Sequence, residues 1–400
     1  MRIAFFTHTF PALSETFIIN QVVGLLEDGH DVTVFALQPP EETTHDIIDE
    51  YDLLDRTVYV GNLNTLSSLV RHAPEFLLES DIPLALKNAD SVVLAPQRLL
   101  AQATFEEHGE FDICHAHFGR SIRIWSFVGD LPDQGPYIGT FYGYDVTKAV
   151  HPDNYDCYET VWDQLDLSIG ISQHIRSRML MLGCAESDST VLRIGVDPEL
   201  FTYDVTPYET DSDLELLSAC RHTGKKGLEY AIRAVADLIG EGHDISYTFA
   251  GDGEKTDEYR SLVRKLGITD AVDFPGLVSQ KRVSELMREA HLYVQPSVTT
   301  PEGDMEGQGL VFQEAQATGT PPIATFHDGI PEGVRHGETG RLVPERDVKA
   351  LSSAIEFFID NPDAIERYAE AGREYIEQRF DYRSIADEQV ELYERAIEQH

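Results

Sequence analysis

Residues 214–227 read LELLSACRHTGKKG and place a strand, a polar loop and the start of a helix in direct succession. The run at 214–219 is short and apolar, as expected of a strand that is buried on both faces of a parallel sheet. Residues 227–240 then carry apolar side chains at helical spacing. The same order returns downstream, where the pattern predicts strands at 245–250, 271–274, 291–295, 321–325 and 340–343. This alternation is typical of βαβ units around a parallel sheet.

The first half of the chain alternates in the same way, with strands expected at 2–7, 31–37, 112–117, 137–141, 167–171 and 190–194. Because 400 residues exceed the size of one ordinary core, the sequence predicts two domains. We therefore expect an α/β protein with two Rossmann-like, doubly wound parallel sheets that face each other across a cleft. Ligands bind beyond the carboxyl ends of such strands, so the functional residues should lie in the loops that follow strands.

The expected N-terminal domain covers 1–205 and the C-terminal domain covers 206–380. A terminal helix at 381–400 should pack back on the N-terminal domain. Residues 198–213 are polar and unpatterned, which predicts a linker, and residues 62–108 read as helical with a weak pattern.

The charge of the chain excludes two classes of partner. Asp and Glu number 70 against 31 Lys and Arg, so the formal net charge is −39. Such a field repels nucleic acids and anionic membranes, and we expect no nucleic-acid partner and at most peripheral membrane contact. The acidic residues are dispersed and only eight lysines occur, as in proteins that work in molar salt. The Debye length there is about 3 Å, which screens the self-repulsion. We expect a halophilic source.

Four cysteines stand far apart without a C-x-x-C motif, which argues against a structural zinc site and a disulfide scaffold. The N-terminal apolar run is too short for a signal peptide, and no stretch of 18 apolar residues occurs. These features predict a cytoplasmic protein, peripheral at most at the inner face of the membrane.

The loop at 220–227 is the first candidate binding site. Arg221, Lys225 and Lys226 lie between a strand and a helix, and two of the eight lysines are adjacent there. Arginine and lysine in such a loop suit a diphosphate clamp, although the loop is not a Walker motif. The alternative is a solvated basic loop.

A second candidate is the glycine-rich and acidic stretch at 300–321, which leads into a helix. Glycines allow a ligand to approach the backbone, and the free amides of a helix start bind phosphate. Glu306 and Glu314 would lie ~12 Å apart along a helix, which is too far for a glycosidase pair but suits two ends of one extended ligand. The alternative is an ordinary loop–helix junction with solvated acids. Asp211 and Asp213 form an Asp-x-Asp triplet that we interpret as solvated.

The N-terminal half offers His115 and His117, which lie two apart on one face of a strand. His117 is nearer the carboxyl end and is the better candidate, while a structural histidine is the alternative for both. Ser14 could cap the following helix or contact a ligand.

Taken in order, these loops resemble the family-4 glycosyltransferases of the GT-B architecture. The motifs that carry the resemblance are FPALSETFI at 10–18, EDGHDV at 27–32, HAHFG at 115–119, TFYGYDV at 140–146, ISQHIRSR at 171–178, RIGVD at 193–197, RHTGKKG at 221–227, GDGE at 251–254, VQPS at 294–297, EGDMEG at 302–307, the two glutamates eight residues apart, and GETGRLVP at 337–344. The first motif and EGDMEG are most similar to members that build extracellular polysaccharides of the colanic-acid or amylovoran type.

The resemblance implies retaining transfer of a sugar from a nucleotide sugar to a hydroxyl of a glycan or lipid-linked acceptor, with no metal and no cofactor. It implies that His117 and Glu306 act at the donor sugar as the catalytic residues. The residues that it assigns to donor binding are Arg221, Lys226, Gly251, Gly309, Leu310, Val311 and Glu314. Those that it assigns to the acceptor side are Ser14, Glu15, Tyr142 and Asp145.

Two positions depart from the family pattern. Tyr142 stands where relatives often have histidine, and Gln308 precedes Gly309 where a proline is more usual near the helix start, which suggests a looser phosphate loop. Two other functions stay open: a GT-B sugar-nucleotide epimerase or phosphorylase, and a non-catalytic sugar-nucleotide-binding partner of a membrane assembly complex.

Overall fold

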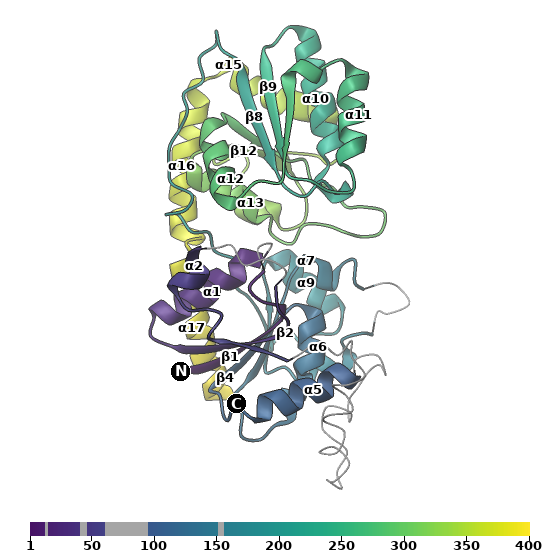
Figure 1. Ribbon diagram of the computed structural model, residues 1–400. Helices are drawn as coiled ribbons and strands as arrows, with labels where there is room; N and C mark the ends of the chain where they lie inside the picture. The colour runs from purple at the N-terminus through teal and green to yellow at the C-terminus, as the bar shows by residue number, and fades with distance from the viewer. Residues whose placement is uncertain (13–14, 41–45, 61–94, 151–155) are drawn as a thin grey trace. The chain divides into compact units, whose positions relative to one another are not determined.

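The computed structural model describes residues 1–12, 15–40, 46–60, 95–150 and 156–400 (Figure 1). The chain divides into two units: unit 1 holds Met1–Leu192 and Ile385–His400, and unit 2 holds Arg193–Ser384. The chain therefore enters unit 2 at Arg193, earlier than the boundary expected at 205/206. In the described ranges, no helix is long and apolar enough to cross a membrane.

The described part of unit 1 forms a seven-stranded parallel sheet in the order β3-β2-β1-β4-β5-β6-β7. Its strands are β1 (Arg2–Thr9), β2 (Asp31–Gln38), β3 (Thr57–Tyr59), β4 (Ile113–His117), β5 (Tyr137–Phe141), β6 (Leu167–Gly170) and β7 (Ser189–Val191). The helices are α1 (Thr16–Glu27), α2 (Asp46–Glu50), α5 (Ala95–Glu106), α6 (Gly119–Trp125), α7 (Gly143–Val146), α8 (Glu159–Trp162) and α9 (Gln173–Met181), with a 3-10 turn at Ser126–Asp130.

Unit 2 forms a six-stranded parallel sheet in the order β10-β9-β8-β11-β12-β13. The strands are β8 (Leu214–Ala219), β9 (Ile245–Ala250), β10 (Val272–Gly276), β11 (Leu292–Val294), β12 (Pro322–Thr325) and β13 (Arg341–Val343). The helices are α10 (Leu228–Glu241), α11 (Thr256–Leu266), α12 (Gln280–Glu289), α13 (Leu310–Thr318), α14 (Ile330–Gly333), α15 (Val348–Asp360) and α16 (Asp363–Arg379), with 3-10 turns at Gly224–Lys226 and Thr269–Ala271.

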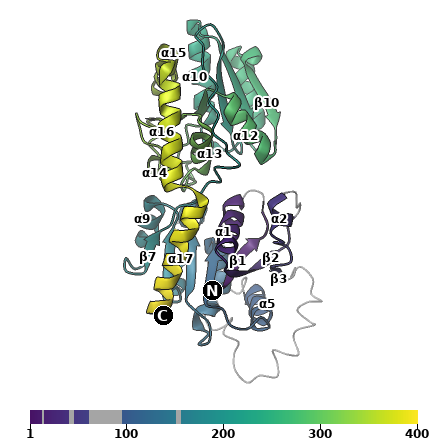
Figure 2. The same cartoon turned by 90° about the vertical axis from the view of Figure 1, so that its left-hand side faces the viewer.

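The core of unit 2 follows from the two-residue period of its strands. Leu214 and Leu216 on β8 pack into a cluster with α10, α11 and α15, whereas Leu217 and Ala219 face a second cluster with α12, α13 and the end of α16. Figure 2 shows α15 and α16 running along this unit. Both faces of β8 are buried, as its continuous apolar run predicts.

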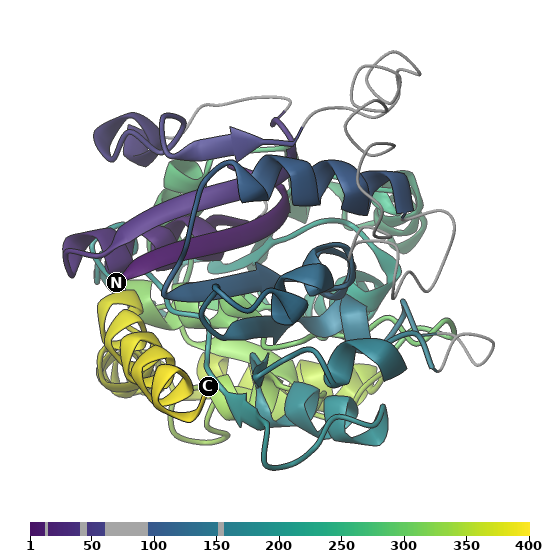
Figure 3. The ribbon, with the colours of Figure 1, turned by 90° about the horizontal axis from the view of Figure 1, so that it is seen from below.

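In unit 1, the two-residue period of strand β1 places the neighbouring residues Phe5 and Phe6 on opposite faces of the sheet. Phe6 on β1 stacks on Trp125 and packs against Phe35 in a cluster of aromatic rings. The preceding Phe5 faces the opposite side, where its ring lies 4.6 Å from that of His117. Figure 3 shows α17 (Tyr382–Gln399) beside the strands of unit 1, and within that unit the Tyr393 hydroxyl lies 2.6 Å from Nδ1 of His115 on β4.

The predicted pair of doubly wound parallel sheets is confirmed. Short strand β3 was not predicted, and most of the weakly patterned stretch at 62–108 lies outside the described residues, apart from α5. In each sheet the strand order reverses once, between β1 and β4 in unit 1 and between β8 and β11 in unit 2. Loops on either side of such a switch point diverge and leave room for a ligand.

Candidate functional site

The loops after β8 and β11 meet at the switch point of unit 2 through two ion pairs. Nζ of Lys226 lies 2.7 Å from a carboxylate oxygen of Glu306, and their side chains are only 14% and 7% exposed. Beside them, Nζ of Lys225 lies 3.2 Å from a carboxylate oxygen of Asp304 and donates to the Met305 carbonyl at 3.3 Å. The topology thus brings the predicted basic loop against the predicted acidic loop.

The Lys226–Glu306 pair is ionised on both sides. Burial alone would raise the pKa of Glu306, but Lys226 and then Lys225 lower it to about 2. Burial likewise opposes the charge on Lys226, and Glu306 outweighs that effect and raises the pKa of the lysine. A buried cation and a buried carboxylate therefore face one another at neutral pH.

Several residues that the sequence analysis did not single out hold Glu306 in place. Ser297 donates a hydrogen bond to its carboxylate at 3.2 Å. Nε2 of His327 accepts from the Glu306 backbone amide at 3.3 Å, and Nδ1 of the same ring bonds the Glu345 carboxylate at 2.8 Å. Ser297 follows β11 and His327 follows β12, so the rule that function lies after strand ends could have found both.

The start of α13 presents the predicted phosphate-binding amides. Gly309 precedes the helix with φ +80°, and a Cβ there would lie 2.7 Å from the Phe312 ring, so glycine is required. Leu310 and Val311 form the first turn, whose backbone N–H groups have no partner within the helix. A phosphate near these amides would also benefit from the helix dipole.

Gln308 anchors this loop, which corrects the expectation that its departure from the family pattern loosens the loop. Its side-chain oxygen accepts from the Ile194 amide at 2.9 Å, and its side-chain nitrogen donates to the Ile194 carbonyl at 3.0 Å. The Gln308 side chain is buried, so the two bonds fix the residue before Gly309 to the segment that enters unit 2.

Glu314 lies one turn further along α13, partly buried. Burial raises the pKa of its carboxyl to about 7, although Lys226 acts in the opposite direction. The two predicted glutamates are thus in different states: Glu306 is ionised and paired, and Glu314 is partly protonated near neutral pH.

The remaining donor-side residues lie at neighbouring strand ends. Arg221 is exposed in the loop after β8. Gly251 follows β9 with φ +123°, and a Cβ there would lie 2.0 Å from the Cys220 carbonyl oxygen. Gly251 also lines a hollow of about 250 Å³ whose other lining residues are Asp252, Gly253, Glu254, Thr256, Asp257, Arg260 and Gly276.

In unit 1, His117 is the last residue of β4 and has no exposed surface. Its ring packs on that of His115, with centroids 4.2 Å apart, as expected for two residues on one face of a strand. Nδ1 of His117 lies 3.0 Å from the Tyr142 hydroxyl, while Nε2 is buried without a hydrogen-bond partner in the described structure. Burial and the neighbouring His115 hold the pKa of His117 well below its usual value, so the ring is neutral.

The expected acceptor-side residues have mixed surroundings. Asp145 is buried, and its carboxylate accepts from the Tyr142 amide at 2.9 Å. Burial raises the pKa of Asp145 to about 6. Glu15 occupies the cap position of α1 without a side-chain cap bond, and Ser14 lies outside the described residues.

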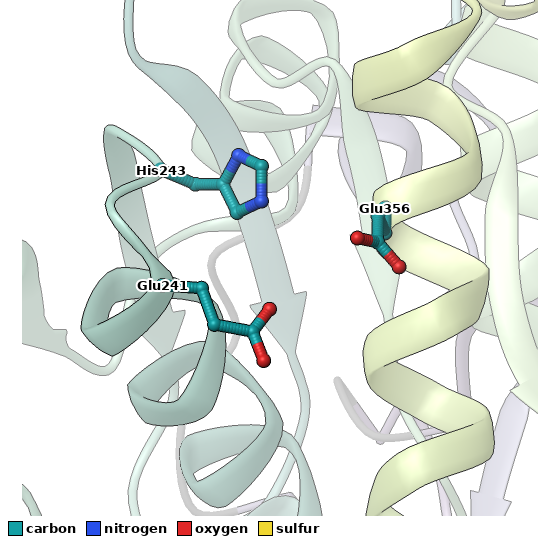
Figure 4. Close-up of side chains that lie close together, drawn as sticks. All are labelled: Glu241, His243 and Glu356. Atoms are coloured by element: carbon teal, nitrogen blue, oxygen red, sulfur yellow. The ribbon is translucent and has the colours of Figure 1, made fainter.

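One group of possible metal ligands occurs in the described ranges, and it lies outside this site. Figure 4 shows Glu241 and His243 at the end of α10 facing Glu356 on α15, with ligand atoms within 4.8 Å of one another. The 14-residue helix α10 begins next to Lys226, so roughly 20 Å of helix separates this group from the ion pair. Asp211 and Asp213 are exposed, in agreement with the solvated interpretation.

The chain is similar to known sugar-transferring enzymes. The family described as "Glycosyl transferases group 1" matches residues 208–375. A putative colanic acid biosynthesis glycosyltransferase, WcaL of Salmonella typhimurium, is 31% identical over 96% of this chain and 97% of its own length. The amylovoran biosynthesis glycosyltransferase AmsK of Erwinia amylovora is 28% identical over 99% of this chain and all of its own.

Solved structures agree on the fold. Sucrose-phosphate synthase from Thermosynechococcus elongatus superposes with a TM-score of 0.75 at 19% identity, over 100% of both chains. Anabaena HepE in complex with UDP and glucose has a TM-score of 0.72 at 18% identity and covers 99% of this chain and 100% of its own. With the two sheets described above, these likenesses confirm the predicted GT-B fold class.

Proposed function

The chain belongs to the group 1 glycosyl transferases, and from that premise we propose that it transfers a sugar, with retention of configuration, from a nucleotide sugar to a hydroxyl of a glycan or lipid-linked acceptor. The two relatives named above are described as enzymes of colanic acid and amylovoran biosynthesis. That likeness supports a role in the synthesis of a cell-surface polysaccharide or glycoconjugate.

The observation that carries the proposal is the buried Lys226–Glu306 pair beside the start of α13. A diphosphate needs cations and amide donors, and Lys226, Arg221 and the first amides of α13 supply both in one place. The hydroxyl groups of a sugar attached to that diphosphate need hydrogen-bond acceptors within a few ångströms of the phosphates. The ionised carboxylate of Glu306 is such an acceptor.

Each predicted donor-side residue has a role in this arrangement. Arg221, Lys226 and the amides of Gly309, Leu310 and Val311 bind the diphosphate. Glu314 accepts from the ribose hydroxyls and Glu306 from the sugar hydroxyls. Gly251 lets the nucleotide approach the backbone after β9.

Catalysis consists mainly of stabilising the leaving group. The bond between the anomeric carbon and the phosphate oxygen breaks, and a bond to the acceptor oxygen forms on the same face of the sugar. The acceptor proton passes to the departing phosphate oxygen, so the transfer needs no protein nucleophile. Lys226, Arg221 and the helix amides stabilise the charge that develops on that phosphate, and electrostatic stabilisation of this kind usually contributes most to enzymatic rate enhancement.

Unit 1 supplies His117, which we place beside the donor sugar, and Glu15, Ser14, Tyr142 and Asp145, which we place on the acceptor side. No metal is needed in this scheme, because Lys226 and Arg221 carry the positive charge.

A thermal-shift screen against sugar nucleotides in molar KCl tests donor binding. A ligand at 100 times its Kd stabilises the protein by about 2.7 kcal/mol, which is readily measured. The responding donor is then incubated with glycan and lipid-linked acceptors, with and without a chelator, and the anomeric configuration of the product is read by NMR.

Three results would contradict the proposal. Sugar release without an acceptor indicates an epimerase, a requirement for inorganic phosphate indicates a phosphorylase, and binding without turnover indicates a non-catalytic partner. Loss of transfer in the chelator, restored by added divalent cation, would overturn the metal-free scheme.

A further inference from the structure

Three hydrogen-bond donors of unit 2 converge on one oxygen of the Glu306 carboxylate. Nζ of Lys226 lies 2.7 Å from Oε1, the Ser297 hydroxyl lies 3.2 Å from the same atom, and Nε2 of Gln295 lies 3.5 Å from it. The second oxygen, Oε2, has no hydrogen-bond partner in the part of the chain that the structure describes. The two oxygens of one carboxylate therefore have different surroundings.

The fully buried Gln295 continues this contact into the interior of unit 2. Its Nε2 lies 2.9 Å from the Ser297 hydroxyl, and its Oε1 lies 2.9 Å from the Tyr293 hydroxyl. Tyr293 lies on β11 and is also fully buried. A chain of hydrogen bonds thus runs from Tyr293 through Gln295 and Ser297 to Glu306.

The charge of Glu306 sets the direction of the bonds in this chain. An ionised carboxylate only accepts, so the Ser297 hydroxyl donates its single hydrogen to Glu306. The Ser297 oxygen is then left to accept from Gln295, which places the amide nitrogen on that side and the amide oxygen toward Tyr293. The opposite orientation of the amide would place its oxygen 3.5 Å from the carboxylate, where two acceptors repel.

We propose that Gln295 is a positioning residue that, together with Ser297, holds Oε1 of Glu306, so that Oε2 is left to accept from a hydroxyl of the donor sugar. The contact with the sugar rests on the proposed function of the chain. Lys226 is a poor anchor by itself, because a bound diphosphate competes for the same ammonium group. Gln295 and Ser297 are uncharged, and they keep their bonds to Glu306 when Lys226 turns toward phosphate.

The variant Gln295→Met tests this role, because methionine is close to glutamine in length and volume and lacks the amide. The Tyr293 hydroxyl stays paired in the variant, since it also donates to the Ala219 carbonyl at 3.2 Å. The full chain in molar KCl is titrated with UDP, GDP, UDP-glucose and GDP-mannose. We expect the Kd of the sugar nucleotide that binds to rise several-fold and kcat/KM for its transfer to fall about 10-fold. The Kd of the matching diphosphate should not change, because Glu306 contacts only the sugar.

Gln316→Met is the matched control in the same unit. The Gln316 amide is buried and donates to the Phe312 and Gly333 carbonyls, so this variant loses similar bonds without touching Glu306. It should leave the ratio of the two dissociation constants, for sugar nucleotide and diphosphate, as in the wild type. If Gln295→Met does not fold, Ser297→Ala carries the same comparison, because it removes the last link to the carboxylate.

Unchanged affinity and transfer in Gln295→Met would overturn the proposal. An equal loss of affinity for the sugar nucleotide and for its diphosphate would also overturn it, because a general disturbance of unit 2 has that effect.

A second readout needs no substrate and separates this proposal from the proposed function. The Glu306 carboxyl signal of a ¹³C-glutamate-labelled chain is assigned by its absence in Glu306→Gln. Gln295→Met should shift that signal and raise the pH at which it titrates, because the ionised form loses a network of donors. A wild type that binds no sugar nucleotide would refute the proposed function, whereas an unmoved carboxyl signal would refute the positioning role.

Discussion

At the residue scale, Lys226 and Glu306 are both buried and both charged, and burial by itself opposes charge. Each side chain is buried enough that its charge is costly alone, and each keeps the other ionised. A donor diphosphate would draw Lys226 toward itself, and a sugar hydroxyl would take its place beside Glu306. The pair therefore keeps both groups charged and oriented before the substrate binds.

We predict that Lys226→Met and Glu306→Gln each cut transfer by ~10²-fold or more, a few kcal/mol of transition-state stabilisation. Lys226→Met should also destabilise unit 2 by about 3–5 kcal/mol, because it leaves the Glu306 charge buried and unpaired. The measurements are kcat/KM for the donor and denaturant unfolding of each variant.

The double variant Lys226→Met/Glu306→Gln is the control for folding. It removes both charges, so it should regain most of the lost stability while transfer stays low. Normal transfer in either single variant would contradict the assignment of the site.

Glu306 and Glu314 should give opposite dependences of stability on pH. The pKa of Glu306 in the folded chain is lowered from 4.5 to about 2. Its contribution to the free energy of unfolding is therefore fully present above pH 4.5 and is lost as the pH falls toward 2. The pKa of Glu314 in the folded chain is raised from 4.5 to about 7. Ionising this carboxyl therefore lowers the free energy of unfolding, an effect that is absent below pH 4.5 and grows as the pH rises through 7.

We expect the wild type to lose about 3 kcal/mol in its free energy of unfolding between pH 4.5 and 8 because Glu314 ionises. The variant Glu314→Gln, which cannot ionise there, should not show this loss. The measurement is the difference between wild-type and variant unfolding curves in molar KCl across that range. Parallel curves would show that Glu314 titrates as in the unfolded chain. Ribose hydroxyls favour the ionised carboxylate, so nucleotide binding near pH 6.5 should release protons, which calorimetry in two buffers detects.

At the element scale, the first turn of α13 is held from outside the helix. Gln308 bonds both backbone groups of Ile194, and that segment also pairs with the chain between α16 and α17 through the bridge between Val196 and Asp381. Gly309 has no side chain that could pack and hold the start of α13. The bonds of Gln308 therefore fix the position of the amides that we expect to bind phosphate.

We predict that Gln308→Ala raises the donor KM several-fold and destabilises unit 2 by ~2–4 kcal/mol, because the Ile194 amide and carbonyl lose buried partners. Gln316→Ala, on the helix α13 that follows, is the matched control. The Gln316 amide donates to the Phe312 and Gly333 carbonyls, so the control loses similar bonds without freeing the loop. Equal effects on KM in both variants would refute a special role for Gln308.

The elements could be read from the sequence more fully than the contacts between them. The apolar runs predicted β8 and β11 and the loops after each, since strand periodicity is a local property. That Lys226 pairs with Glu306 was beyond prediction, because the pairing depends on β8 and β11 being neighbours in the sheet. Ser297 and His327 follow β11 and β12, so a search of the strand ends could have found them, whereas Gln308 was misread because its partner Ile194 lies 114 residues away.

At the scale of the whole molecule, the net charge of −39 opposes both folding and the binding of an anionic donor. We predict that the melting temperature rises by about 10 °C or more between 0.1 M and 3 M KCl. For a structural unit of this size, that rise corresponds to ~3–5 kcal/mol in the free energy of unfolding. The Debye length falls from about 10 Å to below 3 Å over that range, which screens the dispersed acids from one another. Choline chloride at equal concentration is the control, and it should stabilise similarly if screening is the cause.

The same screening sets an expectation for catalysis. In a protein with a basic surface, salt weakens the binding of a phosphate ligand because it screens the attraction. Here the bulk surface repels the donor, while Lys226 and the α13 amides act at short range, and the Lys226 side chain is only 14% exposed. We expect the donor KM to fall or stay level as KCl rises from 0.1 M to 2 M, measured under conditions where the protein is fully folded. A KM that rises steeply with salt, together with a flat melting temperature, would show that the acidic surface has no part in stability or in the approach of the substrate.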